Sequence, residues 1–105
     1  KLFEREHPSA VICANDVIAQ GVIYACIARG LSVPDDVSVV GIGDFRGSSD
    51  MEPSLSTVRL PARRIGTLGA QTLVRMSETG GPPMPRSSEA KVALIPRRST
   101  AFRQQ

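Results

Sequence analysis

The stretch AVICANDVIAQGVIYACIARGLSVPDDVSVVGIG, residues 10–43, decides the fold of this chain. It opens with a short apolar run that predicts a strand, and residues 37–42 form a second run rich in β-branched side chains. Between the two runs, Asn15 or Asp16 supplies a helix N-cap and Gly30 supplies a helix stop. Strand, helix and strand in this order predict a right-handed βαβ unit with parallel strands, and therefore an α/β fold.

The predicted helix is apolar on more than one side. One stripe contains Ile18, Val22 and Ala25, and a second contains Val17, Tyr24 and Ala28. A single sheet face covers only one stripe of a helix. The pattern therefore predicts a second packing partner, which is either another lobe or another subunit.

The remaining residues continue the pattern of an α/β protein. Pro61 suits the first position of a second helix. Its expected core stripe consists of Ile65, Leu68, Ala70, Leu73 and Met76. Before the βαβ unit we expect the end of a helix at residues 2–6, stopped by Pro8. After it we expect a polar loop at 43–53, an extended segment at 55–60 and the second helix at 61–78. An exposed loop at 80–90 and a strand at 91–95 with a basic tail would follow.

Composition places the chain among ordinary globular domains. Its 105 residues suit one small domain or one lobe of a larger protein, with a formal net charge of +3. Cys13 and Cys26 lack the spacing of a redox pair or a zinc site, so we expect buried free thiols in a reducing compartment. The chain has no membrane-spanning run and no visible secretion signal, which favours a cytoplasmic location.

The basic excess does not indicate nucleic-acid binding. No known nucleic-acid reader motif accompanies it. We therefore predict a solvated basic face, to which the main contributors are Arg63, Arg64, Arg97, Arg98 and Arg103.

Catalysis and cofactor binding are poorly supported. The only histidine is His7, in a predicted loop, and the paired carboxylates Asp35 and Asp36 lie in a predicted turn. GIGDFRG, residues 41–47, lacks the last glycine and the helix start of a dinucleotide site. We expect neither enzyme activity nor a cofactor or metal.

Polar side chains instead follow both predicted strands, at the edge where open α/β sheets bind ligands. The Asn15 amide suits a hydroxyl-rich or amide-bearing small molecule, and a purely structural role as N-cap explains it equally well. For Asp16 the N-cap role is favoured.

Four motifs in order resemble the LacI/GalR family of bacterial transcription regulators. They are AVICANDVIAQG, RGLSVPDDVSVVGIGDF, PSLSTVRLPARRIG and PRRST, which together run from residue 10 to residue 100. The resemblance implies a Rossmann-like, three-layer parallel-sheet lobe of a type I periplasmic-binding-protein-like domain. Members carry an amino-terminal helix-turn-helix headpiece and a two-lobed effector domain, so the chain would be a carboxyl-terminal fragment of such a regulator.

The family pattern also divides the chain. Residues 1–60 would form the carboxyl-terminal lobe, and residues 61–80 would give a helix to the other lobe. Residues 81–105 would supply a loop, a returning strand and a tail. The implied partners are a sugar-like effector, a second copy of the chain and operator DNA, which only the missing headpiece would contact; no membrane partner is implied.

The resemblance assigns site residues as well. Asn15 matches an effector-binding asparagine, and Asp44 is the remaining member of an aspartate pair whose first position is Gly43 here. Leu60 replaces a frequent glutamine. These departures favour an effector less polar than a standard sugar, or one bound differently. Arg46 and Arg59 would suit an acidic ligand, although surface solvation is the favoured role for each of them.

The same helix that needs a second partner matches the family's homodimer contact. With the loop at residues 47–52, it would place these residues in the interface: Gln20, Tyr24, Ile27 and Met51. The main rival function is a periplasmic solute-binding protein of a transporter, which shares the two-lobed fold but is a secreted monomer. The dimer-like helix and the motifs VPDDVSVVG and STVRLP favour the regulator.

Overall fold

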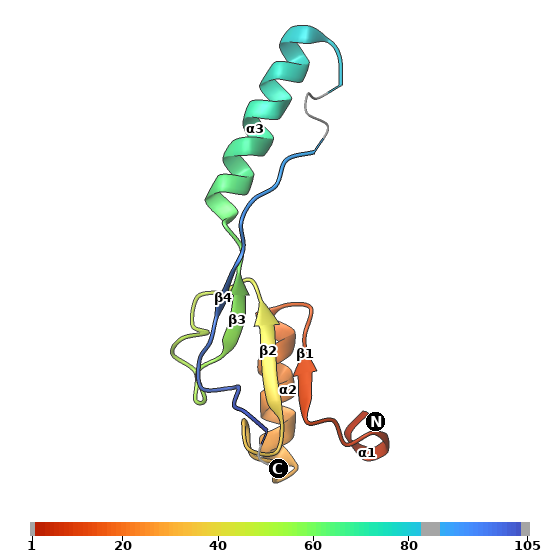
Figure 1. Cartoon of the computed structure of the whole chain (residues 1–105), viewed down its shortest axis with the longest axis vertical. Coiled ribbons are helices and arrows are strands. Elements are labelled where there is room, and N and C mark those ends of the chain that lie inside the picture. Colours follow the sequence, from red (N-terminus) through yellow and green to blue (C-terminus); the bar gives the residue numbers. More distant parts are fainter. Residues whose placement is uncertain (1, 83–86, 104–105) are drawn as a thin grey trace. The chain divides into compact units, whose positions relative to one another are not determined.

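The computed structural model describes residues 2–82 and 87–103 (Figure 1). The chain forms two compact units, of which the first comprises Lys1–Arg59 and Ala93–Gln105 and the second comprises Leu60–Val92. The strand at the end of the chain therefore belongs to the first unit, together with the residues that follow it.

The first unit is built on a mixed sheet of four strands in the order β1-β2-β3-β4. The strands are β1 (Ala10–Ile12), β2 (Ser38–Ile42), β3 (Ser56–Arg59) and β4 (Ala93–Ile95). The first three run parallel, and β4 pairs antiparallel with β3. The α/β class and the mostly parallel sheet predicted from the sequence are confirmed, with one antiparallel strand at the edge.

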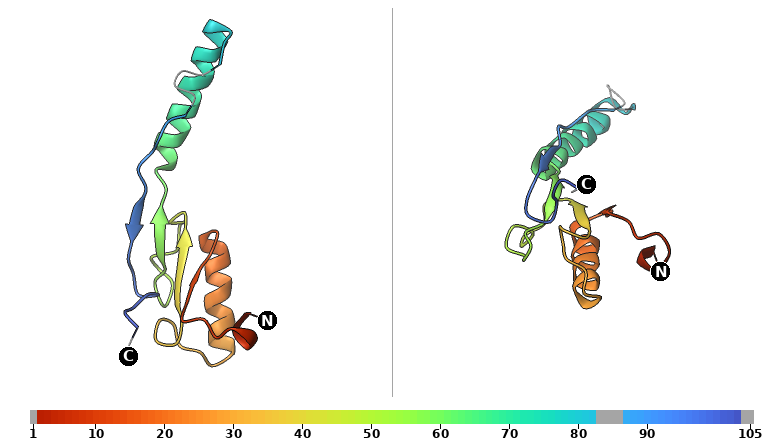
Figure 2. Two further views of the ribbon diagram at one scale, coloured as in Figure 1. Left: turned by 45° about the vertical axis from the view of Figure 1, so that its right-hand side comes forward. Right: turned by 60° about the horizontal axis from the view of Figure 1, so that its bottom comes forward.

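Helix α2 (Asp16–Ala28) packs against one face of this sheet (Figure 2). Asn15 is its N-cap, since the side-chain oxygen accepts a hydrogen bond from the Ile18 amide at 2.9 Å. Gly30 follows its end with a φ of 75°, a left-handed conformation that glycine adopts easily. The predicted helix is thus present, and the N-cap is Asn15 rather than Asp16.

The stripe of α2 that faces the sheet is neither of the two predicted stripes. It contains Ala19, Ile23 and Cys26, which are buried, whereas Ile18 and Tyr24 are exposed. Small residues at 19 and 26 allow the helix to approach the sheet closely. The core combines this stripe with residues of the strands and loops, namely Cys13, Val37, Val39 and Leu55.

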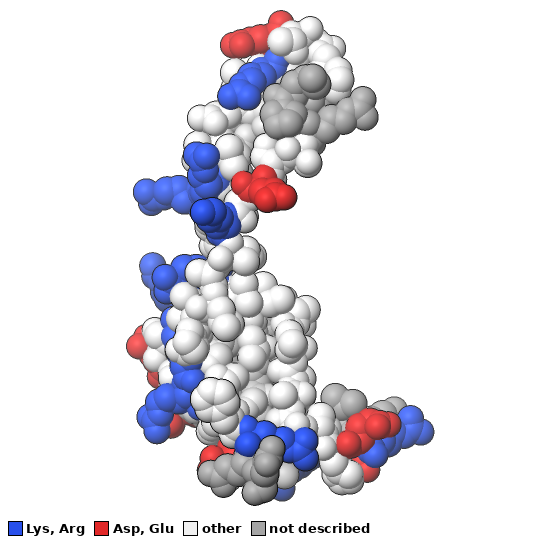
Figure 3. All heavy atoms as spheres, in the orientation of Figure 1, with Lys and Arg blue, Asp and Glu red and all other residues white. Residues whose placement is uncertain are grey.

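The sheet face opposite α2 is apolar and open. Register places Ile12 beside Val40, Ile42 beside Val58, and Val58 beside Leu94, so these side chains share one face. Ile12 is 77% exposed and Leu94 is 65% exposed. Figure 3 shows a broad uncharged surface over this unit. Within the described residues, α2 is the long helix that covers the sheet, so the chain does not itself supply the second helical layer expected from the resemblance.

The segment after β4 is anchored to the first unit at Ser99, whereas residues 101–103 are exposed. Ser99 is fully buried, and its hydroxyl donates to the Val39 carbonyl at 2.6 Å and accepts from the Ser56 amide at 2.8 Å. Its backbone joins the same two regions, because Val39 N donates to Ser99 O and Ser99 N donates to Ser54 O. These bonds fix Ser99 beside β2 and β3.

The outer helices are less buried. A single turn, α1 (Leu2–Arg5), precedes β1 in the first unit. The second unit contains α3 (Ala62–Thr79), which has no buried residue and ends at the left-handed Gly80. The stripe predicted to lie in a core is therefore uncovered in this chain. Residues 83–86 of the predicted loop lie outside the described residues.

Neither α2 nor any other described helix has the length and apolar character that a membrane span requires. Among the described residues, no cluster of three or more His, Cys, Asp or Glu side chains has metal-binding geometry.

Candidate functional site

Polar residues converge at the carboxyl end of the sheet. β1, β2 and β3 point toward the same end (Figure 1). Asn15 and Asp16 follow β1, Asp44 and Phe45 follow β2, and Arg59 is the last residue of β3. This is the edge at which open α/β sheets bind ligands.

Asp16 is the buried centre of this edge. Its carboxylate accepts hydrogen bonds from the Thr57 hydroxyl at 2.6 Å, the Ser48 hydroxyl at 2.6 Å and the Phe45 amide at 2.9 Å. Thr57 and Ser48 are themselves buried. One side chain thus ties the start of α2 to β3 and to the loop after β2. The N-cap role predicted for Asp16 was wrong, while the structural role implied by the resemblance agrees with these bonds.

Gly41 makes room for this carboxylate. A Cβ atom at position 41 would collide with Oδ1 of Asp16. The glycine in β2 therefore permits the close approach of the α2 N-terminus to the sheet.

Asp44 binds two arginines. Its Oδ2 accepts from Nε of Arg59 at 2.8 Å, and its Oδ1 lies 2.8 Å from a terminal nitrogen of Arg97. Hydrogen bonds from Arg97, and then from Arg59, lower the pKa of the Asp44 carboxyl below its ordinary value. Both oxygens of this predicted ligand-binding residue are consequently occupied by partners within the chain.

Arg97 corrects the prediction of a uniformly solvated basic face. Its side chain is only 14% exposed, and the same terminal nitrogen that approaches Asp44 also donates to the Leu55 carbonyl at 2.9 Å. Its backbone amide donates to the Ser56 hydroxyl. Arg98, in contrast, is exposed and pairs with the exposed Glu52.

Gly43 and Phe45 form a matched pair beside Asp44. Gly43 has a φ of 124°, and a Cβ atom there would collide with the Phe45 ring. The ring thus fills the space that a side chain at position 43 would need. Phe45 remains 44% exposed, so it offers an aromatic surface at the carboxyl edge.

The residues predicted for the dimer contact lie on one side of α2 and in the neighbouring loop. Tyr24 and Ile27 are 57% and 53% exposed, and Nε2 of Gln20 donates to the Tyr24 hydroxyl at 3.2 Å. Gln20 and Met51 are half-buried and line a shallow hollow of about 170 Å³. The other residues around this hollow are Asp16, Val17, Phe45, Arg46, Gly47 and Ser48.

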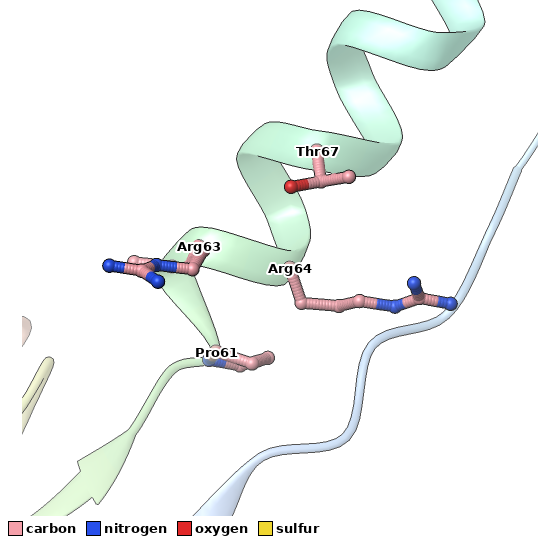
Figure 4. Close-up of a pocket in the computed structure, with 5 residues that line it drawn as sticks. Pro61, Arg63, Arg64 and Thr67 are labelled. Carbon is pink, nitrogen blue, oxygen red and sulfur yellow. The ribbon is translucent and has the colours of Figure 1, made fainter.

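The remaining predicted ligand residues are dispersed. Arg46 is exposed next to Phe45, whereas Leu60 is 39% exposed and belongs to the second unit. In that unit an open hollow of about 500 Å³ lies beside the start of α3, where Arg63 and Arg64 point to different sides of the helix (Figure 4). Because these cations diverge, the hollow presents no convergent polar site.

The sequence did not reveal which residues donate hydrogen bonds to the carboxylates of Asp16 and Asp44. Thr57, Ser48 and Arg97 lie between 32 and 53 residues away from the carboxylates that they contact, and polar residues of this kind also occur on surfaces. A polar pair within the buried strand, Ser56 and Thr57, was the available signal.

Comparison with known proteins identifies the family. The family model described as "periplasmic binding protein-like domain" matches residues 1–100. The chain belongs to this family. The probable HTH-type transcriptional repressor ExuR of Bacillus subtilis is 48% identical over 69 residues, which cover 66% of this chain and 21% of that protein.

Solved structures place the chain among LacI-type effector domains. A dimeric Lac repressor with an 11-residue C-terminal deletion matches with a TM-score of 0.85 and 31% identity, over 98% of this chain and 37% of that one. A LacI family regulator from Arthrobacter sp. FB24, in complex with lactose, matches with a TM-score of 0.80 and 28% identity, over 95% and 37%. The resemblance to LacI-family regulators is confirmed, and these relatives are transcriptional regulators rather than enzymes.

The chain is much shorter than the proteins that it matches. It spans 21 to 29% of the curated relatives ExuR and PurR, and 37% of the Lac repressor structure.

Proposed function

We propose that this chain is the carboxyl-terminal part of the effector domain of a LacI-type transcriptional regulator that works in the cytoplasm. The complete protein would bind a small effector, form a homodimer and control DNA binding by a headpiece outside this chain. The carboxyl edge of the sheet carries the proposal, because it gathers polar side chains where α/β folds bind ligands and lies in a domain matched to regulators.

The open sheet face supports the interpretation as one part of a larger domain. Ile12, Val40, Ile42, Val58 and Leu94 form an apolar surface that a parallel sheet normally buries beneath helices. The uncovered α3 fits the same view, with the helix packing in a second lobe of the complete protein. Both surfaces would be covered by segments absent from this chain.

Effector binding would centre on Asn15. The Asn15 oxygen caps α2, and within the described residues its amide nitrogen has no hydrogen-bond partner. This nitrogen provides two donors for a ligand. Arg46 would complete the contacts within the first unit, and Asp44 would orient Arg59 rather than hold the ligand by itself. The lactose bound by the Arthrobacter relative supports a sugar-like effector.

Homodimer formation would use the exposed side of α2. Tyr24 and Ile27 present apolar surface there, with Gln20 and Met51 at its margin. Exposed apolar stripes of this kind mark protein interfaces. A dimeric Lac repressor among the matched structures supports a symmetric contact between two copies.

The proposed regulation is a shift between two arrangements of the lobes. An effector changes DNA affinity only to the extent that it binds one arrangement better than the other. The chain described here would provide one wall of the effector site and a fixed dimer contact, while the headpiece would contact the operator.

Asn15→Asp tests the effector role in the complete polypeptide that contains this chain. The aspartate keeps an oxygen for the Ile18 amide and retains the N-cap, but it lacks the amide donors. We expect effector-dependent release of DNA to weaken at least tenfold while the thermal unfolding temperature stays within a few degrees of wild type. Asp50→Asn, on an exposed loop residue, serves as the matched control. An unchanged effector response would remove Asn15 from the site.

A further inference from the structure

At the carboxyl edge of the first unit the carboxylates already accept hydrogen bonds within the chain, whereas several donors are free. The carboxylates that directly follow β1 and β2 are Asp16 and Asp44. Asp16 accepts from Thr57, Ser48 and the Phe45 amide, and both oxygens of Asp44 are bound by arginines. The Asn15 oxygen is occupied by the Ile18 amide.

The free polar groups at this edge are of the opposite kind. Within the described residues, the Asn15 amide nitrogen and the terminal nitrogens of Arg59 have no hydrogen-bond partner. Arg59 is held through its Nε by Asp44, and its side chain is 56% exposed. A guanidinium fixed in this way keeps two terminal nitrogens for a planar carboxylate.

The charge at this edge is positive. Asp16 and Asp44 carry two negative charges against the three positive charges of Arg46, Arg59 and Arg97, which leaves the edge with a net positive charge. An anionic ligand would therefore be favoured here over a neutral one of the same shape.

The Phe45 ring offers an apolar contact surface for a ligand. It is 44% exposed and packs where a side chain at Gly43 would otherwise lie. Its backbone is held by the hydrogen bond from its amide to Asp16. A fixed, partly exposed ring is suited to the apolar C–H face of a pyranose or a similar ring.

Building on the proposed effector function, we propose that the effector is a sugar acid. Its carboxylate is bound by Arg59 and the Asn15 amide, and its apolar ring face packs on Phe45. A hydroxyl-only sugar would have to share the neighbouring carboxylate oxygens with the donors that they already bind within the chain.

Titration calorimetry of the complete polypeptide that contains this chain tests the proposal with two matched sugar pairs. D-galacturonate is compared with D-galactose, and D-glucuronate with D-glucose, because the members of each pair share their hydroxyl stereochemistry. We expect at least one acid to bind with a Kd at least tenfold lower than that of its neutral partner. Equal or tighter binding of both neutral sugars overturns the proposal, and so does the absence of binding by all four.

Arg59→Gln then assigns the preference to its residue. We expect this variant to lose most of the tenfold preference for the acid, while Arg75→Gln, an exposed arginine of α3, keeps it. An acid preference that survives Arg59→Gln overturns the assigned carboxylate contact. Tight binding of a neutral sugar would contradict the sugar-acid inference alone, whereas failure of the proposed function would appear as a complete polypeptide that does not bind DNA.

Discussion

Removing the Asp16 carboxylate should destabilise the first unit more than any change at an exposed acidic residue. Asp16→Ala leaves the Thr57 hydroxyl, the Ser48 hydroxyl and the Phe45 amide without their acceptor. Thr57 is 0% exposed and Ser48 is 4% exposed, so water reaches neither readily. The loss also disconnects the start of α2 from β3.

The magnitude follows from the number of donors. A buried donor that loses its partner costs about 1–3 kcal/mol. Thr57 keeps one bond, since its hydroxyl also accepts from the Asp44 amide, and hydroxyls can rotate toward other acceptors. Taking the lower value for each of the donors gives a destabilisation of about 3 kcal/mol. Asp16→Asn retains one acceptor oxygen and should cost about half as much.

Urea unfolding followed by circular dichroism measures this difference. Asp50→Ala is the matched control, because Asp50 is exposed in the loop that Asp16 anchors, and we expect its effect to stay within about 0.5 kcal/mol. The reasoning is refuted if Asp16→Ala costs no more than Asp50→Ala, since the buried carboxylate would then contribute nothing to the fold.

Further predictions concern the same region and the core. Gly41→Ala should destabilise the protein by forcing its Cβ against Asp16, and the cost should shrink in the Asp16→Ala background, which a double-mutant cycle in urea would measure. The lowered pKa of Asp44 means that its contribution to stability is present above its unfolded pKa, near 3.8, and is lost as the pH falls through the folded value. Urea midpoints between pH 2 and pH 6 should therefore fall less steeply for Asp44→Asn than for wild type. Burial raises the pKa of the Cys13 and Cys26 thiols, so both should react with Ellman's reagent at pH 8 only after urea is added, and rapid labelling of the native protein would contradict their burial.

The βαβ unit was predictable because its signals are local. Apolar runs, the cap at Asn15 and the stop at Gly30 all act within a few residues of the element that they define. The face that α2 turns toward the sheet was not predictable in the same way. A helix that is apolar almost all round does not reveal its buried stripe, which in α2 contains the small residues Ala19 and Cys26.

The polar interior of the site was beyond local reasoning. Arg97 had every sequence feature of a solvated arginine. In the structure its side chain is mostly buried and forms an ion pair with Asp44, which lies far earlier in the chain. Likewise, Asp16 looked like a helix cap from its sequence position alone. The hydroxyls that donate to its carboxylate belong to Ser48 and Thr57, which lie far along the chain in other parts of the fold. Distant charge pairs and buried hydroxyls acquire their roles only once the sheet has brought them together.

The central claim is that this chain belongs to a DNA-binding, effector-controlled regulator rather than to a secreted solute-binding protein. Reading the coding sequence upstream of Lys1 tests that claim most directly. The account predicts a helix-turn-helix headpiece at the far amino terminus, preceded by no export signal. A signal peptide with no headpiece would contradict it and would assign the same effector edge to a transport protein.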